Sequence, residues 1–151
     1  MGFYGLLQWQ GFDIVNYINA YESNVFGTFG NPNFQSSLLG ILGSVVFTQL
    51  LSWSVKIQIK SAYLLYLLLT IYVIKETDSQ QGFLVLLIGS AVSLGVFVNY
   101  KSRLLGYSYL GFGIVAFVAV LVGTLNKGPL ASLLYKDSVA YRGDYWRAGW
   151  K

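Results

Sequence analysis

The sequence predicts an all-α protein whose helices cross a membrane about four times. Of its 151 residues, ten are Lys or Arg and six are Asp or Glu, so charged residues make up 11% of the chain. A soluble domain has about a quarter charged residues, so this chain has too few to cover a wet surface. The second observation is a set of long apolar runs without any charge, which lie at 34–53, 61–74, 82–98 and 104–125.

Aromatic residues near the ends of these runs are the third observation. Rings with an apolar body and a polar tip favour the boundary between lipid and water, although a helical core also packs such rings. The residues in question are Trp53, Tyr63, Tyr72, Tyr100, Tyr107 and Tyr109.

The lengths of the runs fit membrane spans. At about 1.5 Å of rise per residue, the first run covers the roughly 30 Å hydrocarbon core. The second run is short, but Ile57 and Ile59 extend it, and Lys60 can reach toward the headgroups. The third is near the lower limit, and the fourth can cross with some tilt. The predicted spans are 34–53, 58–75, 82–98 and 104–125, followed by an extracytoplasmic loop or helix over 126–151.

Basic residues in the loops predict the orientation. Residues 1–33 carry no Lys or Arg, and the loop between the second and third spans has only Lys75. The loops after the first and third spans have two basic residues each. Because basic loops favour the cytoplasm, residues 1–33 and the second loop are predicted to be extracytoplasmic. The basic tail then lies outside too, against this rule, and we expect its cations to have a role.

Several function classes are excluded by composition. The chain has no Cys and no His, so it lacks disulfides, thiolate chemistry and the commonest general base and metal ligand. No charged residue lies inside an apolar run to mark an ion pathway. The net charge of +4 is spread over the loops, and no glycine-rich nucleotide motif follows a strand. We therefore expect neither a metal, a cofactor nor a nucleic-acid partner.

Three polar clusters fall on one face of the membrane in this topology. They precede the first span, precede the third span and follow the fourth, at 27–34, 77–82 and 142–147. Only the parity of the spans decides this arrangement, so the clusters stay together even if the orientation is inverted.

The first cluster, GTFGNPNF, has a structural and a functional interpretation. Asn31 suits a helix N-cap with Pro32 at the first helical position, and Gly27 and Gly30 allow a tight turn. The same helix N-terminus, with its free amides and partial positive charge, attracts an anion such as a phosphate. Asn31 and Asn33 are therefore candidate substrate-binding residues.

The second cluster also allows a purely structural interpretation. Thr77 with Gln80, and Asp78 with Gln81, have the spacing of a capping box at the start of the third span. A ligand is not needed to explain this segment.

The third cluster combines cations with aromatic rings. Asp137 can cap a helix on which Arg142 and Trp146 are four residues apart, and Asp144 is placed three residues before Arg147. Such a group can anchor the tail at the membrane surface. It can equally hold a lipid-linked phosphate, since a guanidinium group matches phosphate oxygens with two parallel hydrogen bonds.

The order GTFGNPNF, an apolar span, DSQQGFLVLL and RGDYWRAGW resembles the O-antigen ligase and polymerase family of bacterial envelope proteins. YGLLQ at 4–8, followed by Gly11, is also similar to the stretch before the family's GNPN turn. The resemblance covers the central part of a family member and implies a multi-pass protein of the bacterial cytoplasmic membrane.

The activity implied by this resemblance belongs to lipopolysaccharide and other cell-envelope polysaccharide biosynthesis. It is metal-independent, inverting transfer of a glycan from an undecaprenyl pyrophosphate carrier to a sugar, lipid or glycoprotein acceptor. The implied partners are thus membrane lipid, a lipid-linked glycan donor and the acceptor.

The resemblance also assigns residues. Arg142 matches the Arg of the family's R-x-x-Y-W pattern, which implies that it stabilises the departing pyrophosphate. Trp146 and Arg147 are neighbouring substrate-binding candidates, and Arg147 is one by its position and charge, not by the family pattern. Gln80 stands where many relatives have a phosphate-holding Arg, and it brings a donor without charge. Because the family's catalytic His is also missing, we expect these 151 residues to be an incomplete fragment that is inactive alone.

A non-enzymatic membrane scaffold or assembly subunit is the alternative. It would explain the spans without a complete site. Small residues at helix-contact spacing, Gly40 with Ser44 and Gly89 with Ser93, are typical of packed membrane helices.

Overall fold

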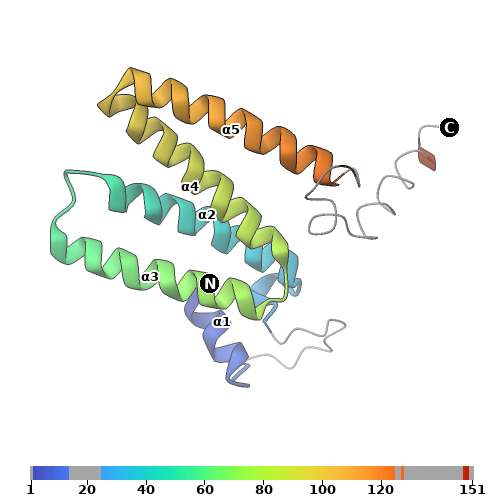
Figure 1. Cartoon of the computed structure of the whole chain (residues 1–151). Helices are drawn as coiled ribbons and strands as arrows, with labels where there is room; N and C mark the ends of the chain where they lie inside the picture. The colour runs from blue at the N-terminus through green and yellow to red at the C-terminus, as the bar shows by residue number, and fades with distance from the viewer. Residues whose placement is uncertain (1, 14–24, 125–126, 128–147, 150–151) are drawn as a thin grey trace. The chain divides into compact units, whose positions relative to one another are not determined.

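The computed structural model describes residues 2–13, 25–124, 127 and 148–149, and these residues form helices without strands (Figure 1). The elements are α1 (Gly2–Trp9), the short 3₁₀ helix η1 (Gly27–Phe29), α2 (Pro32–Leu51), α3 (Ile57–Glu76), α4 (Gln80–Lys101) and α5 (Arg103–Thr124). Four of the described helices are long and apolar enough to span a membrane. The predicted all-α class with about four spans is therefore confirmed.

Each predicted span overlaps one helix. The helices α2 and α4 begin before the predicted starts at 34 and 82, because the polar residues ahead of each apolar run are already helical. The predicted loop or helix over 126–151 lies outside the described residues, apart from Lys127, Ala148 and Gly149.

The chain divides into two units, Met1–Phe97 and Val98–Lys151. The first unit contains α1, η1, α2, α3 and most of α4. The second contains the end of α4 and all of α5. Each unit is described by itself.

The helix α1 is short because its sequence provides a stop. Gly11 has a φ of 83°, and the amides of Gly11 and Phe12 donate to the carbonyl oxygens of Gln8 and Leu7 at 2.9 Å. This pair of bonds is the Schellman ending, which needs a residue that tolerates a left-handed backbone. The Trp9 ring then meets the Tyr72 ring of α3 edge-on, with centroids 5.4 Å apart.

The start of α2 follows the predicted cap. Asn31 has an extended backbone, its side chain accepts a 2.8 Å hydrogen bond from the Asn33 amide, and Pro32 occupies the first turn. Proline suits this place because the first helical amides have no intrahelical partner. The N-cap interpretation of Asn31 is confirmed.

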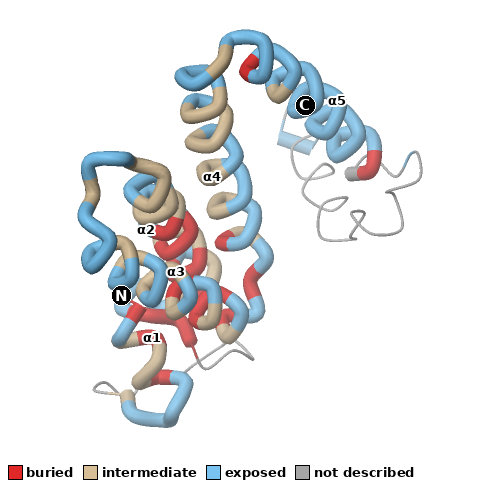
Figure 2. Tube along the Cα trace, turned by 60° about the vertical axis from the view of Figure 1, so that its left-hand side comes forward, coloured by how far each residue is buried: buried red, intermediate tan, exposed pale blue. Residues whose placement is uncertain are grey.

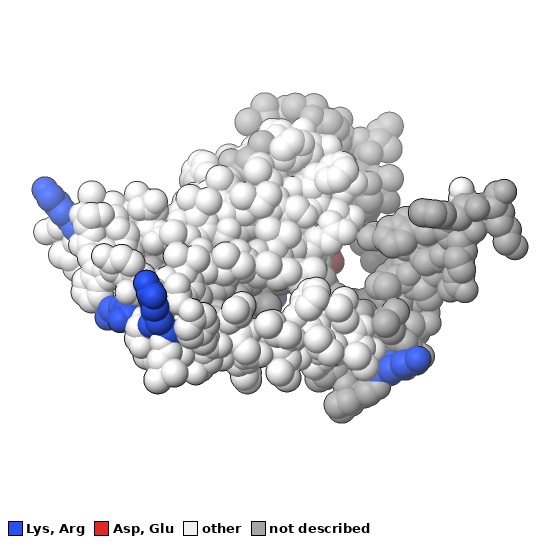
Figure 3. Space-filling model, turned by 90° about the horizontal axis from the view of Figure 1, so that it is seen from above, with Lys and Arg blue, Asp and Glu red and all other residues white. Residues whose placement is uncertain are grey.

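The first unit has a small core where α1, α2 and α3 meet (Figure 2). Val25, Leu39, Val73 and Ile74 are buried there, with Leu6, Leu69 and Leu86 packed against them. Most other large apolar side chains are exposed, and the described residues on the face in Figure 3 are mostly uncharged, with a few Lys and Arg among them. Exposed apolar helices of this length are suited to lipid as their solvent.

Small residues bring α2 and α4 close together. A Cβ added at Gly40 would lie 2.5 Å from the Gly82 carbonyl oxygen, and one added at Gly89 would lie 2.5 Å from the Ser44 Cβ. One turn further, Thr48 Oγ1 and Ser93 Oγ are 2.7 Å apart. The predicted role of these small residues in helix contact is confirmed. Their pairing also shows that α2 and α4 run in the same direction.

In the second unit, α4 and α5 are separated by a single residue, Ser102, whose carbonyl oxygen accepts from the Gly106 amide at 2.9 Å. Gly106 is buried against Asn99, where a larger side chain would clash. Figure 2 shows α5 as almost wholly exposed, and its apolar side chains include Leu104 at 77% and Phe112 at 75% exposure.

Candidate functional site

Two of the three predicted polar clusters meet where α2 and α4 begin. The Ser79 hydroxyl donates to Asn33 Oδ1 at 2.8 Å. The Ser36 hydroxyl donates a shared hydrogen bond to Ser79 Oγ at 2.8 Å and to the Asn33 carbonyl oxygen at 3.0 Å. Since Ser36 and Ser79 are buried, these bonds join the turn before α2 to the loop before α4 away from solvent. We call this contact the Asn33–Ser36–Ser79 junction.

The capping boxes predicted at 77–82 are wrong. The Thr77 amide donates to the Ile74 carbonyl oxygen, and the Asp78 amide donates to that of Lys75, both at 3.2 Å. These amides are therefore not available to Gln80 and Gln81. The physical reason is that the last turn of α3 extends its hydrogen bonding through Thr77, which ends that helix.

Thr77 and Asp78 form a tight connection between α3 and α4. The buried Thr77 hydroxyl donates to the Ile74 carbonyl oxygen at 2.6 Å and accepts from the Ser79 amide at 3.3 Å. Asp78 has a φ of 53°, a left-handed conformation that Asp tolerates better than most residues. This turn positions Ser79 for its bond to Asn33.

The two glutamines that follow lie at the same edge. Gln80 is the first residue of α4 and is exposed, whereas Gln81 Oε1 accepts from the Ser37 hydroxyl at 3.5 Å. The structure thus brings Asn33 together with Ser79, the residue before Gln80, and Asn31 caps the same helix, α2, that contains Asn33. Arg142, Trp146 and Arg147, the other predicted site residues, lie outside the described residues.

The polar contacts between α1 and the turn at Gly27 were not predicted from the sequence. Gln8 is buried, its Oε1 accepts from the Gly27 amide at 2.8 Å, and its Nε2 donates to Asp13 Oδ2 at 3.0 Å. The Tyr4 hydroxyl donates to the other oxygen of the same carboxylate. The isolated polar residues Gln8 and Asp13 among apolar neighbours were the only available signal.

Gln35 fills the space beneath the turn. It is fully buried, and a Cβ added at Gly27 would clash with its side-chain amide. Gly27 also has a φ of 62°, so both space and backbone conformation exclude a side chain there. Gly5 of α1 packs on the same group, with its added Cβ 3.6 Å from Gln35 Nε2. The turn is therefore held from α1 and α2 at once.

The arrangement suits an anion more than a cation. Two helices begin beside each other, so the partial positive charges of their N-termini add at one place. The side-chain oxygen of Asn33 accepts from Ser79, and the NH₂ group of the same side chain can donate to a ligand. The exposed side chain of Gln80 adds a second neutral amide. Within the described residues, no group of His, Cys, Asp and Glu side chains is arranged to hold a metal.

Charged groups are scarce at this face among the described residues. Asp78 is exposed, and Lys75 forms a 3.6 Å ion pair with Glu76 at the end of α3. No described arginine lies in the turn or the loop. The described part of the site therefore offers hydrogen-bond donors and helix ends rather than fixed positive charge.

Comparison with protein-family models, with curated proteins and with solved structures finds no match to this chain.

Proposed function

We propose that this chain is part of a membrane glycosyltransferase of the O-antigen ligase and polymerase type. It transfers a glycan from a lipid-linked pyrophosphate donor to an acceptor hydroxyl at the face where α2 and α4 begin. In this proposal the face is the extracytoplasmic side of the bacterial cytoplasmic membrane. The Ser79–Asn33 hydrogen bond carries the proposal, because it joins two of the polar clusters that the order of the spans predicts on one face of the membrane.

The surroundings of the site support a lipid-linked substrate. Apolar side chains are exposed along the helices that lead away from the junction, including Leu65 at 70% and Leu87 at 68% exposure. An isoprenoid chain can lie against such surfaces within the bilayer. Its pyrophosphate then stays at the polar boundary, where the helix N-termini and neutral amides are found.

The reaction separates into charge stabilisation and proton removal. The acceptor hydroxyl attacks the anomeric carbon, the bond from that carbon to the pyrophosphate oxygen breaks, and the pyrophosphate leaves with the bonding electron pair. Donors fixed near the leaving oxygen stabilise the developing charge without reorganising. Asn33 and Gln80 are proposed donors, and Arg142 is proposed to supply the positive charge, with Arg147 and Trp146 beside it.

The acceptor proton needs a base that these residues do not identify. The chain has no His, and Gln80 replaces the charged residue of many relatives in the family it resembles. We therefore expect the 151 residues alone to show no transfer. Activity of this sequence alone on a lipid-linked donor would contradict that expectation.

The test is a transfer assay with the full-length protein in lipid, using a glycan on undecaprenyl pyrophosphate as donor. Arg142→Ala should abolish transfer while leaving membrane insertion intact, because a cation at the leaving group is lost. Arg103→Ala removes the same charge from the start of α5 and serves as the matched control. Unchanged transfer by Arg142→Ala would remove the pyrophosphate role from this residue, and an inactive wild-type protein would contradict the proposed function.

The structure accounts for one of the two observations behind the scaffold alternative. The small residues that suggested a helix partner, Gly40, Ser44, Gly89 and Ser93, pack α2 and α4 on each other within the chain. They therefore do not indicate a second protein.

A further inference from the structure

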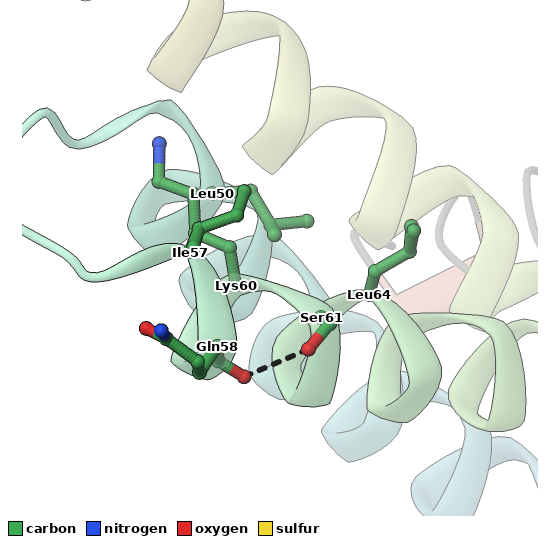
Figure 4. Close-up of a pocket in the computed structure, with 6 residues that line it drawn as sticks. All are labelled: Leu50, Ile57, Gln58, Lys60, Ser61 and Leu64. Carbon is green, nitrogen blue, oxygen red and sulfur yellow. Dashed lines mark hydrogen bonds between the residues drawn. The ribbon is translucent and has the colours of Figure 1, made fainter.

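A groove lies at the far end of α2 and α3 from the Asn33–Ser36–Ser79 junction. It has a volume of about 450 Å³ and lies where α2 ends and α3 begins (Figure 4). Its lining residues are Leu50, Ile57, Gln58, Lys60, Ser61 and Leu64. Since Ser36 and Leu50 are separated by about four turns of α2, the groove and the junction are on the order of 20 Å apart.

The walls of the groove are apolar. Leu50 comes from α2, and Ile57 and Leu64 come from α3. The one hydroxyl in the lining, that of Ser61, donates to the Gln58 carbonyl oxygen at 2.8 Å, as Figure 4 shows, so its proton is already used. An apolar chain therefore fits this surface better than a hydrogen-bonding solute.

The lysines at the rim make no ion pair with an acidic side chain in the part of the chain that the structure describes. Lys56 is the N-cap of α3 and makes no side-chain cap bond, and the first turn of α3 contains no acidic residue. Lys60 lies one turn later and lines the groove. Two cations thus sit at the positive end of a helix dipole, where an anion would be favourable. The sequence has no Asp or Glu from residue 25 to residue 75 to supply that negative charge.

We propose that this groove binds an anionic phospholipid. The acyl chain lies along Leu50, Ile57 and Leu64, and the phosphate lies between the Lys60 ammonium group and the start of α3. A free phosphate would leave the apolar walls unused, whereas a lipid uses both parts. Lysine suits this place because its alkyl stem follows the apolar wall while its charged end reaches the headgroups.

The interfacial position of the groove supports a lipid as the occupant. Trp53, in the short connection between α2 and α3, is 74% exposed and stacks on Phe97 of α4 with ring centroids 6.2 Å apart. An exposed Trp ring at the end of a span is typical of the headgroup level. The groove therefore opens where a lipid places its phosphate.

The experiment measures retention of phosphatidylglycerol against phosphatidylcholine by native mass spectrometry of the protein from mixed nanodiscs. Lys60→Gln should lower the preference for phosphatidylglycerol about fivefold, the effect of one lysine near an anionic surface. Lys75→Gln is the matched control, because it removes the same charge from the other end of α3, where the side chain is 72% exposed. An equal loss in both variants, or no loss with Lys60→Gln, would overturn the proposal.

A second pair of variants tests the apolar half of the site. Ser61→Phe places a ring in the groove and should reduce retention of phosphatidylglycerol, whereas Ala62→Phe, at an exposed neighbour outside the lining, should not. Inorganic phosphate at millimolar concentration should not displace the lipid. Full retention with Ser61→Phe, or displacement by phosphate alone, would show that the groove does not hold the acyl chain. None of these outcomes depends on glycan transfer.

Discussion

Ser79 and Asn33 are 46 residues apart in the chain, and the hydroxyl of the first donates to the side-chain oxygen of the second at 2.8 Å. The bond is not isolated, because Ser36 contacts both residues and Gly82 packs its backbone on Ser36 one turn into α4. Such a close approach of two helices needs small side chains on both of them. It makes the starts of α2 and α4 one structural element, and this element is the basis of the proposed site.

Ser79→Ala should destabilise the protein by about 1–2 kcal/mol, because it leaves the half-buried Asn33 oxygen and the buried Ser36 hydroxyl without this partner. The free energy of unfolding in detergent or lipid measures the effect. Ser108→Ala is the control, since the Ser108 hydroxyl is exposed and bonds only within its own helix. An equal effect of both substitutions would contradict the importance of the junction.

Substitutions of Asn31 can distinguish its role as a helix cap from its proposed role in binding an anion. Asn31→Asp keeps an oxygen for the Asn33 amide and should preserve stability, whereas Asn31→Ala should cost about 1 kcal/mol. The added negative charge of Asp should nevertheless weaken binding of the lipid-linked donor. Thermal unfolding and donor binding are measured on both variants. Unchanged donor affinity in Asn31→Asp would indicate a helix cap without a ligand role.

Gly40→Ala should destabilise the packing of α2 on α4 by about 1–3 kcal/mol, because a Cβ there meets the Gly82 carbonyl oxygen at 2.5 Å and the backbone cannot move aside alone. Gly111→Ala in α5 has nothing within 4 Å of the added atom and should be neutral or slightly stabilising. Thermal unfolding of both variants checks the contrast. Equal melting temperatures would show that α2 and α4 are not closely packed.

The sequence predicted the helices better than their contacts. Uncharged runs of span length were sufficient for α2 to α5, and Asn31 with Pro32 marked the start of α2, because these signals are local. The Ser79–Asn33 bond could not be predicted, since it depends on which helix faces lie together. The capping boxes failed for a local reason: the last turn of α3 uses the amides of Thr77 and Asp78, and spacing alone does not show this.

The contact that fixes the turn at Gly27 to α1 could not be predicted from the sequence either. Gln8 looked like one of several polar residues near the N-terminus, yet its side chain holds the Gly27 amide from 19 residues away. Only the fold brings the two together. The predicted residues of the tail, Arg142, Trp146 and Arg147, lie outside the described part of the chain and stay predictions.

Gln80→Arg should strengthen donor binding, because it places a guanidinium group at the exposed start of α4, beside the proposed phosphate position. Stability should be unchanged, since the side chain faces solvent. The KM of the full-length protein for the lipid-linked donor should fall several-fold. A Gln80→Lys variant tests whether charge alone is sufficient. An unchanged or raised KM in both variants would argue against a phosphate at this position.

The most direct test of the proposed site is photocrosslinking of a lipid-linked pyrophosphate glycan to the full-length protein in membranes. A benzophenone amino acid at position 80, at the start of α4, should label the donor, and excess unlabelled donor should compete. The same probe at position 100, near the other end of α4, where Tyr100 is 87% exposed, should not label it. Competable labelling at position 80 alone is the predicted result. Labelling at position 100 alone, or equal labelling at both positions, would contradict a donor site at the junction of α2 and α4.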